Sequence, residues 1–390
     1  MIDKSMKRWS LCFIGFLFLM VFLLQGRLCA ADKLYIWNAE ELEAIKTDPS
    51  KKALADRYVA KADSCLLLQP LTVVDKSWSF AEDKHYYCTM APYWWPIEVN
   101  GKTVFVNRDG HVNPQSLDLD KAKIAQLGDR MKLLAIAYYF TGDGRYFDAY
   151  REQLDVWFIN QDTYMYPDFL YAQVVPGRNG NKGRGVGIGE GHGFNDVLES
   201  FRLIDSVRSV GTRRRGKVIA WFRRLGDWMA TSAQGIEQAK MNNNLGISYD
   251  TTLANISLFV GNRARAEQIF DQFSEKRTFK QIEEDGKMPG ELQRTKAFSY
   301  SVYCLDFFTD FFLLASSAGT DAYERDRDRY NAAYKFLLQF VDNHETFPYN
   351  QIIGWRDSTR SLYDQIDRLK RIDPEIADRL TINSASSVEK

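Results

Sequence analysis

The sequence predicts a single all-α domain made of antiparallel helix pairs, and two observations carry that prediction. Apolar residues recur at helical spacing, stop at a glycine and then resume, and this pattern occurs three times along the chain. Proline is scarce, at 10 of 390 residues, and the two-residue alternation typical of strands is rare. Helix, glycine turn and helix in succession favour stacked antiparallel pairs.

The first pair is expected within residues 124–158. Its second helix should occupy residues 146–158, after a stop at Gly142, because glycine beside Asp143 is a helix stop signal. Apolar side chains at spacings of three and four mark one face of its first helix, namely Ile124, Leu127, Met131, Leu134 and Tyr138.

Two further pairs are expected over residues 253–273 and 307–340, each with a glycine between its helices. No shift in composition marks a linker between these pairs and the first one. We therefore expect one domain over residues 32–375, followed by a polar tail at 376–390 that is disordered.

The first 31 residues are predicted to be a secretory signal peptide. Basic residues at Lys4, Lys7 and Arg8 precede an apolar run at 11–24, and small residues follow at 29–31. The run has 14 residues, short of the ~20 that a membrane-spanning helix needs, although an uncleaved anchor is the alternative. We therefore expect a periplasmic or secreted protein with no membrane contact after cleavage.

Charge and composition narrow the class of partner. Lys+Arg and Asp+Glu both number 51, and a net charge of zero argues against a nucleic-acid-binding protein. Aromatic residues make up 14%, which fits either a large helical core or a cleft whose rings stack on sugars. The oligomeric state is not indicated.

Three cysteines lie beyond the predicted signal peptide: Cys65, Cys88 and Cys304. Their scattered spacing does not fit a zinc site, and an odd number leaves at least one unpaired within the chain. A Cys65–Cys88 bridge and buried thiols are both open. We predict no metal and no cofactor.

Aromatic residues and a histidine gather in the segment 83–96. Tyr93, Trp94 and Trp95 lie side by side between two prolines, so they cannot all be buried on one helix face. Flat rings pack well against the CH-rich face of a sugar, so these three residues and the nearby His85 are candidate substrate-binding residues. A hydrophobic plug beneath a loop would explain the same residues.

A glycine-rich loop at 176–193 carries candidate anion-binding residues. Glycines let backbone N–H groups approach a ligand closely, and Arg178 and Arg184 suit a carboxylate or sulfate, with Gln173 beside them. The spacing fits neither a P-loop nor a dinucleotide fingerprint, so no nucleotide is expected. His192 follows, but a lone histidine is more often structural than catalytic.

Two later segments combine polar residues with a helix start. Asn243 and Asn244 belong to a run of three asparagines, which indicates a helix N-terminus or amide donors for a substrate carboxylate. Arg294 and Tyr300 are six residues apart, and they can flank one pocket if a helix begins between them.

Together these segments resemble the alginate-lyase-type polysaccharide lyases. The resemblance runs in order from about residue 80 to 370, and each motif alone is weak. The matching motifs are Met90-Ala91-Pro92-Tyr93-Trp94-Trp95-Pro96, Arg108-Asp109-Gly110, Asn113-Pro114, Tyr171-Ala172-Gln173, Gly183-Arg184-Gly185, Asn243-Asn244-x-Gly246-x-x-Tyr249-Asp250, Glu291-Leu292-x-Arg294-Thr295 and Phe347-Pro348-Tyr349. The resemblance implies an incomplete (α/α) toroid of antiparallel helix pairs, open at one end, with a long cleft.

The resemblance also implies a reaction, the β-elimination of a uronate-containing polysaccharide or oligosaccharide without an obligatory cofactor. The uronate carboxylate must be neutralised, a base must take the C5 proton, and an acid must protonate the leaving O4. By resemblance, Asn244 and Arg294 neutralise the carboxylate, Tyr249 helps to bind substrate, and Tyr300 is the acid and, in a syn elimination, also the base. An unperturbed tyrosine has a pKa near ~10, so Arg294 would have to favour the phenolate.

Leu245 departs from the family pattern Asn-Asn-His-Gly-x-x-Tyr, because it stands where the histidine belongs. Leucine cannot move a proton, and three explanations are open. Tyr300 serves as both base and acid; or His85 or His192 reaches the site from another loop; or the protein is a degenerate lyase that binds acidic polysaccharide without cleaving it.

A toroidal glycoside hydrolase is the other enzymatic alternative. Such an enzyme needs two facing carboxylates, and the spacing of the available acids pairs none of them. Those acids are Glu190, Glu284, Asp285 and Glu291.

Overall fold

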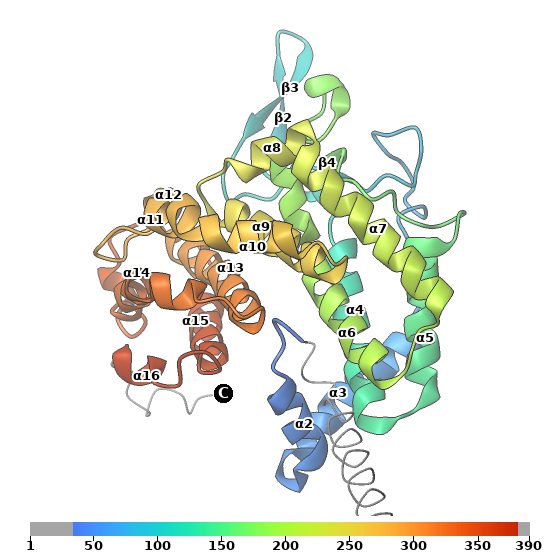
Figure 1. Cartoon of the computed structure of the whole chain (residues 1–390). Helices are drawn as coiled ribbons and strands as arrows, with labels where there is room; N and C mark the ends of the chain where they lie inside the picture. Colours follow the sequence, from blue (N-terminus) through green and yellow to red (C-terminus); the bar gives the residue numbers. More distant parts are fainter. Residues whose placement is uncertain (1–33, 381–390) are drawn as a thin grey trace, which may run out of the picture.

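The computed structural model describes residues 34–380, which form antiparallel helix pairs arranged as an incomplete ring (Figure 1). The predicted signal peptide, and residues 381–390 of the predicted tail, lie outside the described residues. The all-α prediction is confirmed, since strands occupy only two small sheets.

Helices of the first half of the chain form one side of the ring, and those of the second half form the middle and the other side (Figure 1). The first group is α2 (Ala39–Thr47), α3 (Lys52–Leu66), α4 (Lys123–Thr141), α5 (Gly144–Leu154), α6 (Phe194–Val207), α7 (Thr212–Thr231) and α8 (Ala233–Ala239). The second group is α9 (Asn244–Phe259), α10 (Arg263–Phe273), α11 (Phe279–Gln281), α12 (Pro289–Leu292), α13 (Ala297–Ser317), α14 (Ala322–Leu338), α15 (Trp355–Leu369) and α16 (Ile376–Arg379).

The three predicted helix pairs are present as α4–α5, α9–α10 and α13–α14. Gly142 ends α4 with a left-handed φ of 69°, and its N–H donates to the carbonyl of Tyr138. The next helix starts at once, because the Asp143 side chain accepts from the N–H of Arg145 and so caps α5. Gly261 and Gly319 also adopt positive φ, so the glycine signal marks the turn in every pair.

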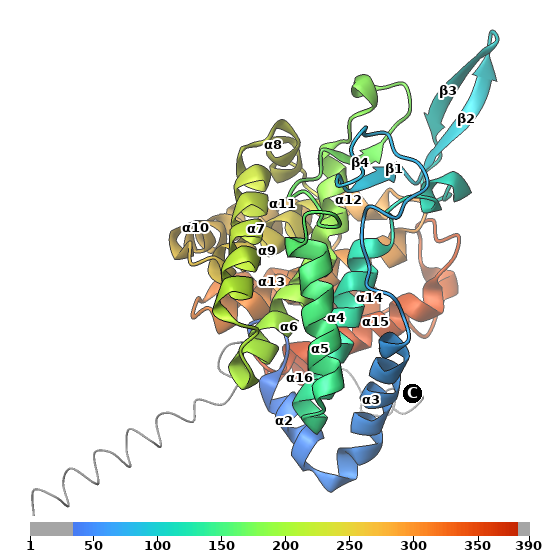
Figure 2. The ribbon, with the colours of Figure 1, turned by 90° about the vertical axis from the view of Figure 1, so that its right-hand side faces the viewer.

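The two small sheets come from the irregular segments and lie at the same end of the ring. Strands β2 (Trp94–Val99) and β3 (Lys102–Asn107) form an antiparallel hairpin that projects away from the helices (Figure 2). Strand β1 (Cys88–Met90) pairs in parallel with β4 (Tyr171–Val174), so the chain before the hairpin lies against the start of the glycine-rich loop.

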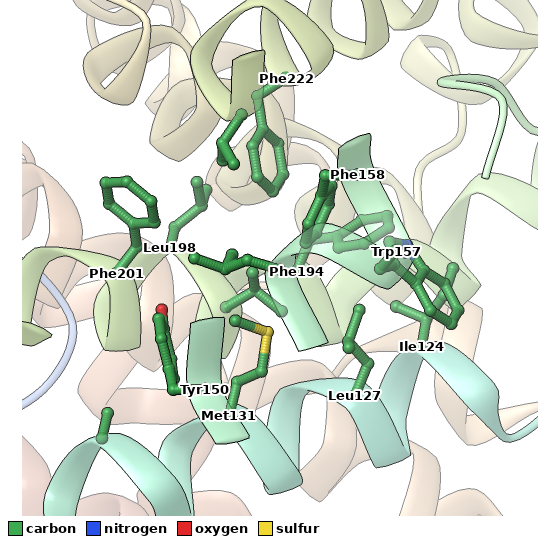
Figure 3. Close-up of a cluster of buried hydrophobic side chains, with 14 of the residues drawn as sticks. Ile124, Leu127, Met131, Tyr150, Trp157, Phe158, Phe194, Leu198, Phe201 and Phe222 are labelled. Atoms are coloured by element: carbon green, nitrogen blue, oxygen red, sulfur yellow. The ribbon is translucent and has the colours of Figure 1, made fainter. Parts of the chain in front are cut away.

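Two hydrophobic clusters fill the body, and α9 contributes to both. In the first, Phe194 packs edge-to-face on Phe222 with ring centroids 5.7 Å apart, and Phe158 lies 5.4 Å from the same ring (Figure 3). Most of α13 is buried in the second, so this helix, although long and apolar enough to cross a membrane, is placed as the core helix of a folded domain.

The first described residues form a strap across the other end of the ring. The backbone N–H groups of Tyr35, Ile36 and Trp37 all donate to Oε2 of Glu199 on α6, at 2.9, 3.0 and 3.1 Å. Arg371, just after α15, donates to the carbonyl oxygens of Trp37 at 2.7 Å and Tyr35 at 2.5 Å. This N-terminal strap (residues 35–37) therefore ties the first half of the ring to the last helices.

Cys65, Cys88 and Cys304 are all buried and unpaired. The Cys65–Cys88 bridge is therefore absent, and the alternative of buried thiols is what the structure shows. Within residues 34–380, no group of three or more His, Cys, Asp or Glu side chains is arranged to hold a metal ion.

Candidate active site

Tyr300 lies where the base of the hairpin meets the start of α13. Because α13 begins at Ala297, Arg294 lies in the turn before the helix and Tyr300 in its first turn, as the spacing required. The Arg294 guanidinium stacks 3.9 Å from the centre of the Tyr300 ring. The Tyr300 hydroxyl is 2.8 Å from the hydroxyl of Tyr93, which precedes β2. These three side chains form the centre of the candidate site.

Asp109 fixes the position of Arg294. Nη2 of Arg294 donates to Asp109 Oδ1 at 2.7 Å, its Nε donates to the same carboxylate at 3.1 Å, and the N–H of Thr295 donates at 3.2 Å. Gly110 has a φ of +74°, and a Cβ there would lie 2.3 Å from Oγ1 of Thr295, so only glycine allows this approach. Sequence reasoning missed this role of Asp109, although the Arg108-Asp109-Gly110 motif could have signalled it.

Glu291 orients Asn244 in the same way. The backbone N–H and the side-chain amide of Asn244 each donate to one oxygen of Glu291, both at 2.9 Å. Glu291 is only 1% exposed, and Nη1 of Arg294 is 4.0 Å from its Oε2. Asn243 is the N-cap of α9 and accepts from the N–H of Leu245, so the asparagine run does mark a helix start.

The protonation states follow from burial and from these contacts. Burial and the hydrogen bond with Tyr93 raise the pKa of Tyr300, and the Arg294 charge opposes this only in part. The expected net preference for the phenolate is therefore absent, and Tyr300 is a neutral phenol. Burial also raises the pKa of Glu291, whereas hydrogen bonds from Arg294 and Thr295 overcome burial and lower the pKa of Asp109.

Basic residues of the glycine-rich loop gather on Trp94. The guanidinium of Arg178 lies 4.4 Å from its ring centre and that of Arg184 lies 5.7 Å from it. Arg184 also donates to Oε1 of Gln173 at 3.1 Å, and Gln173 has a φ of +54°, which costs energy for a residue with a Cβ. The structure thus brings Trp94, Gln173, Arg178 and Arg184 together in one cluster, and their role in substrate binding stays a prediction. Trp95 is the next residue on β2, so its side chain points to the opposite face from that of Trp94, and its Nε1 donates to the carbonyl of His111 at 2.9 Å.

Two candidate residues lie elsewhere. His85 stacks on Tyr166, with ring centroids 5.2 Å apart, and its Nδ1 is 2.5 Å from the carbonyl oxygen of Tyr164. Tyr249 is 4% exposed and donates to the carbonyl of Met229, so it belongs to the core behind α9.

His192 lies deeper in the ring than Asn244. Its Nδ1 is 3.3 Å from Oγ of Ser248, which is one helical turn beyond Asn244 on α9. Its Nε2 is 3.0 Å from Oδ2 of Asp310, and the ring lines a polar cavity of about 940 Å³ that extends to Trp37 in the N-terminal strap. Both ring nitrogens of His192 therefore already have hydrogen-bond partners, Asp310 and Ser248, deeper in the ring than Asn244.

Leu245 packs against the glycine-rich loop. A Cβ on Gly189 would lie 2.6 Å from Cδ2 of Leu245, so the leucine occupies the space that this glycine leaves. The side chain is half-buried at the start of α9, one residue after Asn244. It fills the histidine position of the family pattern with an apolar group.

The acids considered for a glycoside hydrolase do not form a facing pair. Glu190 is bound by Thr89 at 2.8 Å and by Lys121, whereas Glu291 is bound by Asn244. Glu284 and Asp285 have largely exposed side chains, at 92% and 53%.

Comparison with known proteins identifies the family and the fold. The sequence profile of the family described as alginate lyase matches residues 75–347. An alginate lyase from Bacteroides ovatus is 32% identical, with a TM-score of 0.84 over 88% of this chain and 93% of that one. No curated protein sequence matches significantly.

Two more distant structures are also similar. Alginate lyase A1-III from Sphingomonas species A1 is 16% identical, with a TM-score of 0.47 over 74% of this chain and 77% of that one. A variant of that enzyme complexed with a tetrasaccharide is likewise 16% identical, with a TM-score of 0.48 and the same coverage. From the profile match and the Bacteroides structure, the chain belongs to the alginate lyase family and has its (α/α) toroid, which supports a polysaccharide lyase.

Proposed function

We propose that this protein cleaves a uronate-containing polysaccharide by β-elimination, with Tyr300 as the proton-transfer residue. One observation carries the proposal: the Tyr300 hydroxyl is held 2.8 Å from Tyr93 while its ring stacks under Arg294. A phenol fixed from two sides can protonate a leaving oxygen at a defined place.

Tyr300 enters the reaction as a protonated phenol, the form that can act as an acid. Its raised pKa keeps the hydroxyl protonated at neutral pH, which suits protonation of the leaving O4. To act as base as well, Tyr300 must first lose its proton to solvent. The phenolate then takes the C5 proton and passes it to O4 as the C4–O4 bond breaks, which leaves the phenolate again. One residue can serve both steps only when C5–H and O4 lie on the same face of the sugar. A syn elimination is therefore proposed.

The uronate carboxylate would be neutralised by donors that surround Tyr300. Nη1 of Arg294 is the nitrogen that does not bond to Asp109, and the Asn244 amide has one hydrogen beyond the one given to Glu291. The cluster of Gln173, Arg178 and Arg184 supplies further positive charge near the hairpin. Donors held in advance by Asp109 and Glu291 stabilise the developing enolate without having to reorganise.

The partner proposed here is an acidic polysaccharide or oligosaccharide. We propose that the protein acts in the periplasm or outside the cell, and the signal-like segment at residues 1–31 supports this.

The test is ultraviolet absorbance of the new double bond, followed while purified mature protein is incubated with alginate, glucuronan and glycosaminoglycans. We expect a rise with at least one polymer, which identifies the substrate. The Leu245→His variant runs beside it, and we expect higher or broader activity because the imidazole restores a second proton acceptor. No rise with any polymer in either protein, together with measurable binding, would replace the lyase by a polysaccharide-binding protein.

A further inference from the structure

A groove runs between α13 and α15 directly beside Tyr300. It has a volume of about 310 Å³, and Tyr300, Tyr303, Asp357, Ser358 and Ser361 contribute to its lining. This size is at the lower end of the range for small-molecule sites. The groove lies on the helical side of Tyr300, and none of the arginines that surround Trp94 lines it.

Tyr303 gives the groove an exposed aromatic face. It is 46% exposed although its ring lies only 4.4 Å from that of the buried Phe307. It follows Tyr300 by three residues on α13, so the two rings lie on the same side of the helix. Within the described chain its hydroxyl makes no hydrogen bond. An exposed ring with an unused hydroxyl can stack on a sugar and also bond to it.

The other lining groups suit hydroxyls. Ser358 and Ser361 can donate to or accept from a sugar hydroxyl, and a carboxylate such as Asp357 can accept from two. Asp357 is the only charged residue among those that line the groove; Arg356 and Arg360 on the same helix are not among them. A uronate carboxylate placed here would face Asp357 with no cation in the lining to offset the repulsion.

We propose that this groove is a subsite for an uncharged sugar unit next to the uronate that undergoes elimination. The uronate lies on the side of Arg294 and the glycine-rich loop, and its neutral neighbour stacks on Tyr303. The substrate class is then a polysaccharide in which uronates alternate with neutral sugars, and a pure polyuronate such as alginate fits less well. This inference rests on the proposed function.

The test compares kcat/KM on two kinds of polymer. Hyaluronan and heparosan, in which glucuronate alternates with N-acetylglucosamine, are set against alginate and glucuronan, which contain only uronates. We expect at least a tenfold preference for one of the alternating polymers. Asp357→Lys should reduce that preference at least tenfold by raising turnover of the polyuronates. Asp328→Lys on α14, whose side chain is fully exposed, is the matched control and should change nothing.

Two outcomes overturn the subsite: a preference for alginate or glucuronan in the wild type, or no change in preference with Asp357→Lys. Absence of turnover on every polymer counts against the proposed function instead. In that case direct binding measurements decide. Oligosaccharides in which uronates alternate with neutral sugars, and oligosaccharides made only of uronates, are titrated into the wild type, Tyr303→Ala and Asp357→Lys. Equal binding of both kinds, unaffected by Tyr303→Ala, would also remove the subsite.

Discussion

The two walls that meet at Tyr300 are built from different kinds of structure. The loop wall consists of Tyr93 and Trp94 of the hairpin segment, Gln173 on the short strand β4, and Arg178 and Arg184 of the glycine-rich loop. It is positively charged, and it includes a strained backbone at Gln173. Loops can adopt such conformations, so this wall can aim several donors at one anion.

The helix wall consists of Tyr300, Tyr303 and Asp357 on α13 and α15. Its backbone is regular, and the exposed groups that line the groove are a ring, hydroxyls and one carboxylate. Under the proposed function, this contrast corresponds to a division of work, in which the loop wall would bind the charged part of the substrate and the helix wall would hold the phenol and the uncharged part.

Replacing Tyr300 by Phe should have the largest effect, because it removes the one group that belongs to both steps of the reaction. We expect kcat to fall at least ~10³-fold, within the range for loss of a proton-transfer group. Polysaccharide binding should persist, since the ring can still stack under Arg294. Absorbance assays measure the fall in kcat, and calorimetry measures polysaccharide binding. Turnover within tenfold of wild type would remove Tyr300 from the mechanism.

Glu291→Gln tests whether Asn244 must be held in place. Glu291 accepts two hydrogen bonds from Asn244, one on each carboxylate oxygen. A glutamine has only one oxygen there, and its NH₂ group would face the second Asn244 donor. That buried donor would lose its partner, at a cost of about 1–3 kcal/mol. We expect kcat/KM to fall about 10- to 100-fold with the fold retained. Glu284→Gln, at an exposed carboxylate, is the control and should be neutral. Equal activity of the two variants would mean that the orientation of Asn244 is unimportant.

Asp109→Asn should reveal a stability difference that depends on pH. Hydrogen bonds from Arg294 and Thr295 hold the folded-state pKa of Asp109 below its ordinary value, so its contribution to stability is present above the ordinary value and is lost as pH falls through the folded pKa. We expect Asp109→Asn to lower the free energy of unfolding by about 1–2 kcal/mol at pH 7, and by less at lower pH. Urea unfolding at several pH values measures it, with exposed Asp148→Asn as the control. A loss that stays constant with pH would exclude the ion pair as its cause.

Tyr93→Phe should have the smallest effect, and its signature is a shift in pH dependence. The hydrogen bond between the Tyr300 and Tyr93 hydroxyls favours the neutral phenol and so helps to raise the pKa of Tyr300; without it the phenolate forms more readily. If the phenolate is the base, activity should rise toward alkaline pH in both proteins, and the rise should begin at lower pH in the variant. The kcat profile measures this. Superimposable profiles would indicate that Tyr300 acts only as the acid.

The loop wall could be predicted from sequence because its residues break helical periodicity. Tyr93, Trp94 and Arg184 occur in runs that no helix face explains, and the structure brings them toward one place. Tyr303 could not be found in this way, since it lies within the apolar sequence of α13 and looks like one more core residue.

Pairing across the chain was also invisible in the sequence. Asp109 and Arg294 are 185 residues apart, and Asn244 and Glu291 are 47 apart. Tyr249 shows the opposite error: it is five residues after Asn244 on α9, which turns it roughly 140° away toward the core. A shared motif placed it near the site, but helix geometry points its side chain elsewhere.

The N-terminal strap has a consequence for how the chain reaches its folded state. The bond between Tyr35 and Arg371 joins residues 336 positions apart, so it cannot form until almost the whole chain is available. Contacts of such long sequence separation are slow to form, because the entropy of closing the loop is lost before any stabilisation is gained. During synthesis the first residues therefore stay unattached to α15 until the chain is nearly complete. A chain that ended before Arg371 would lack this closure and leave the strap held by Glu199, Asp196 and Ser317.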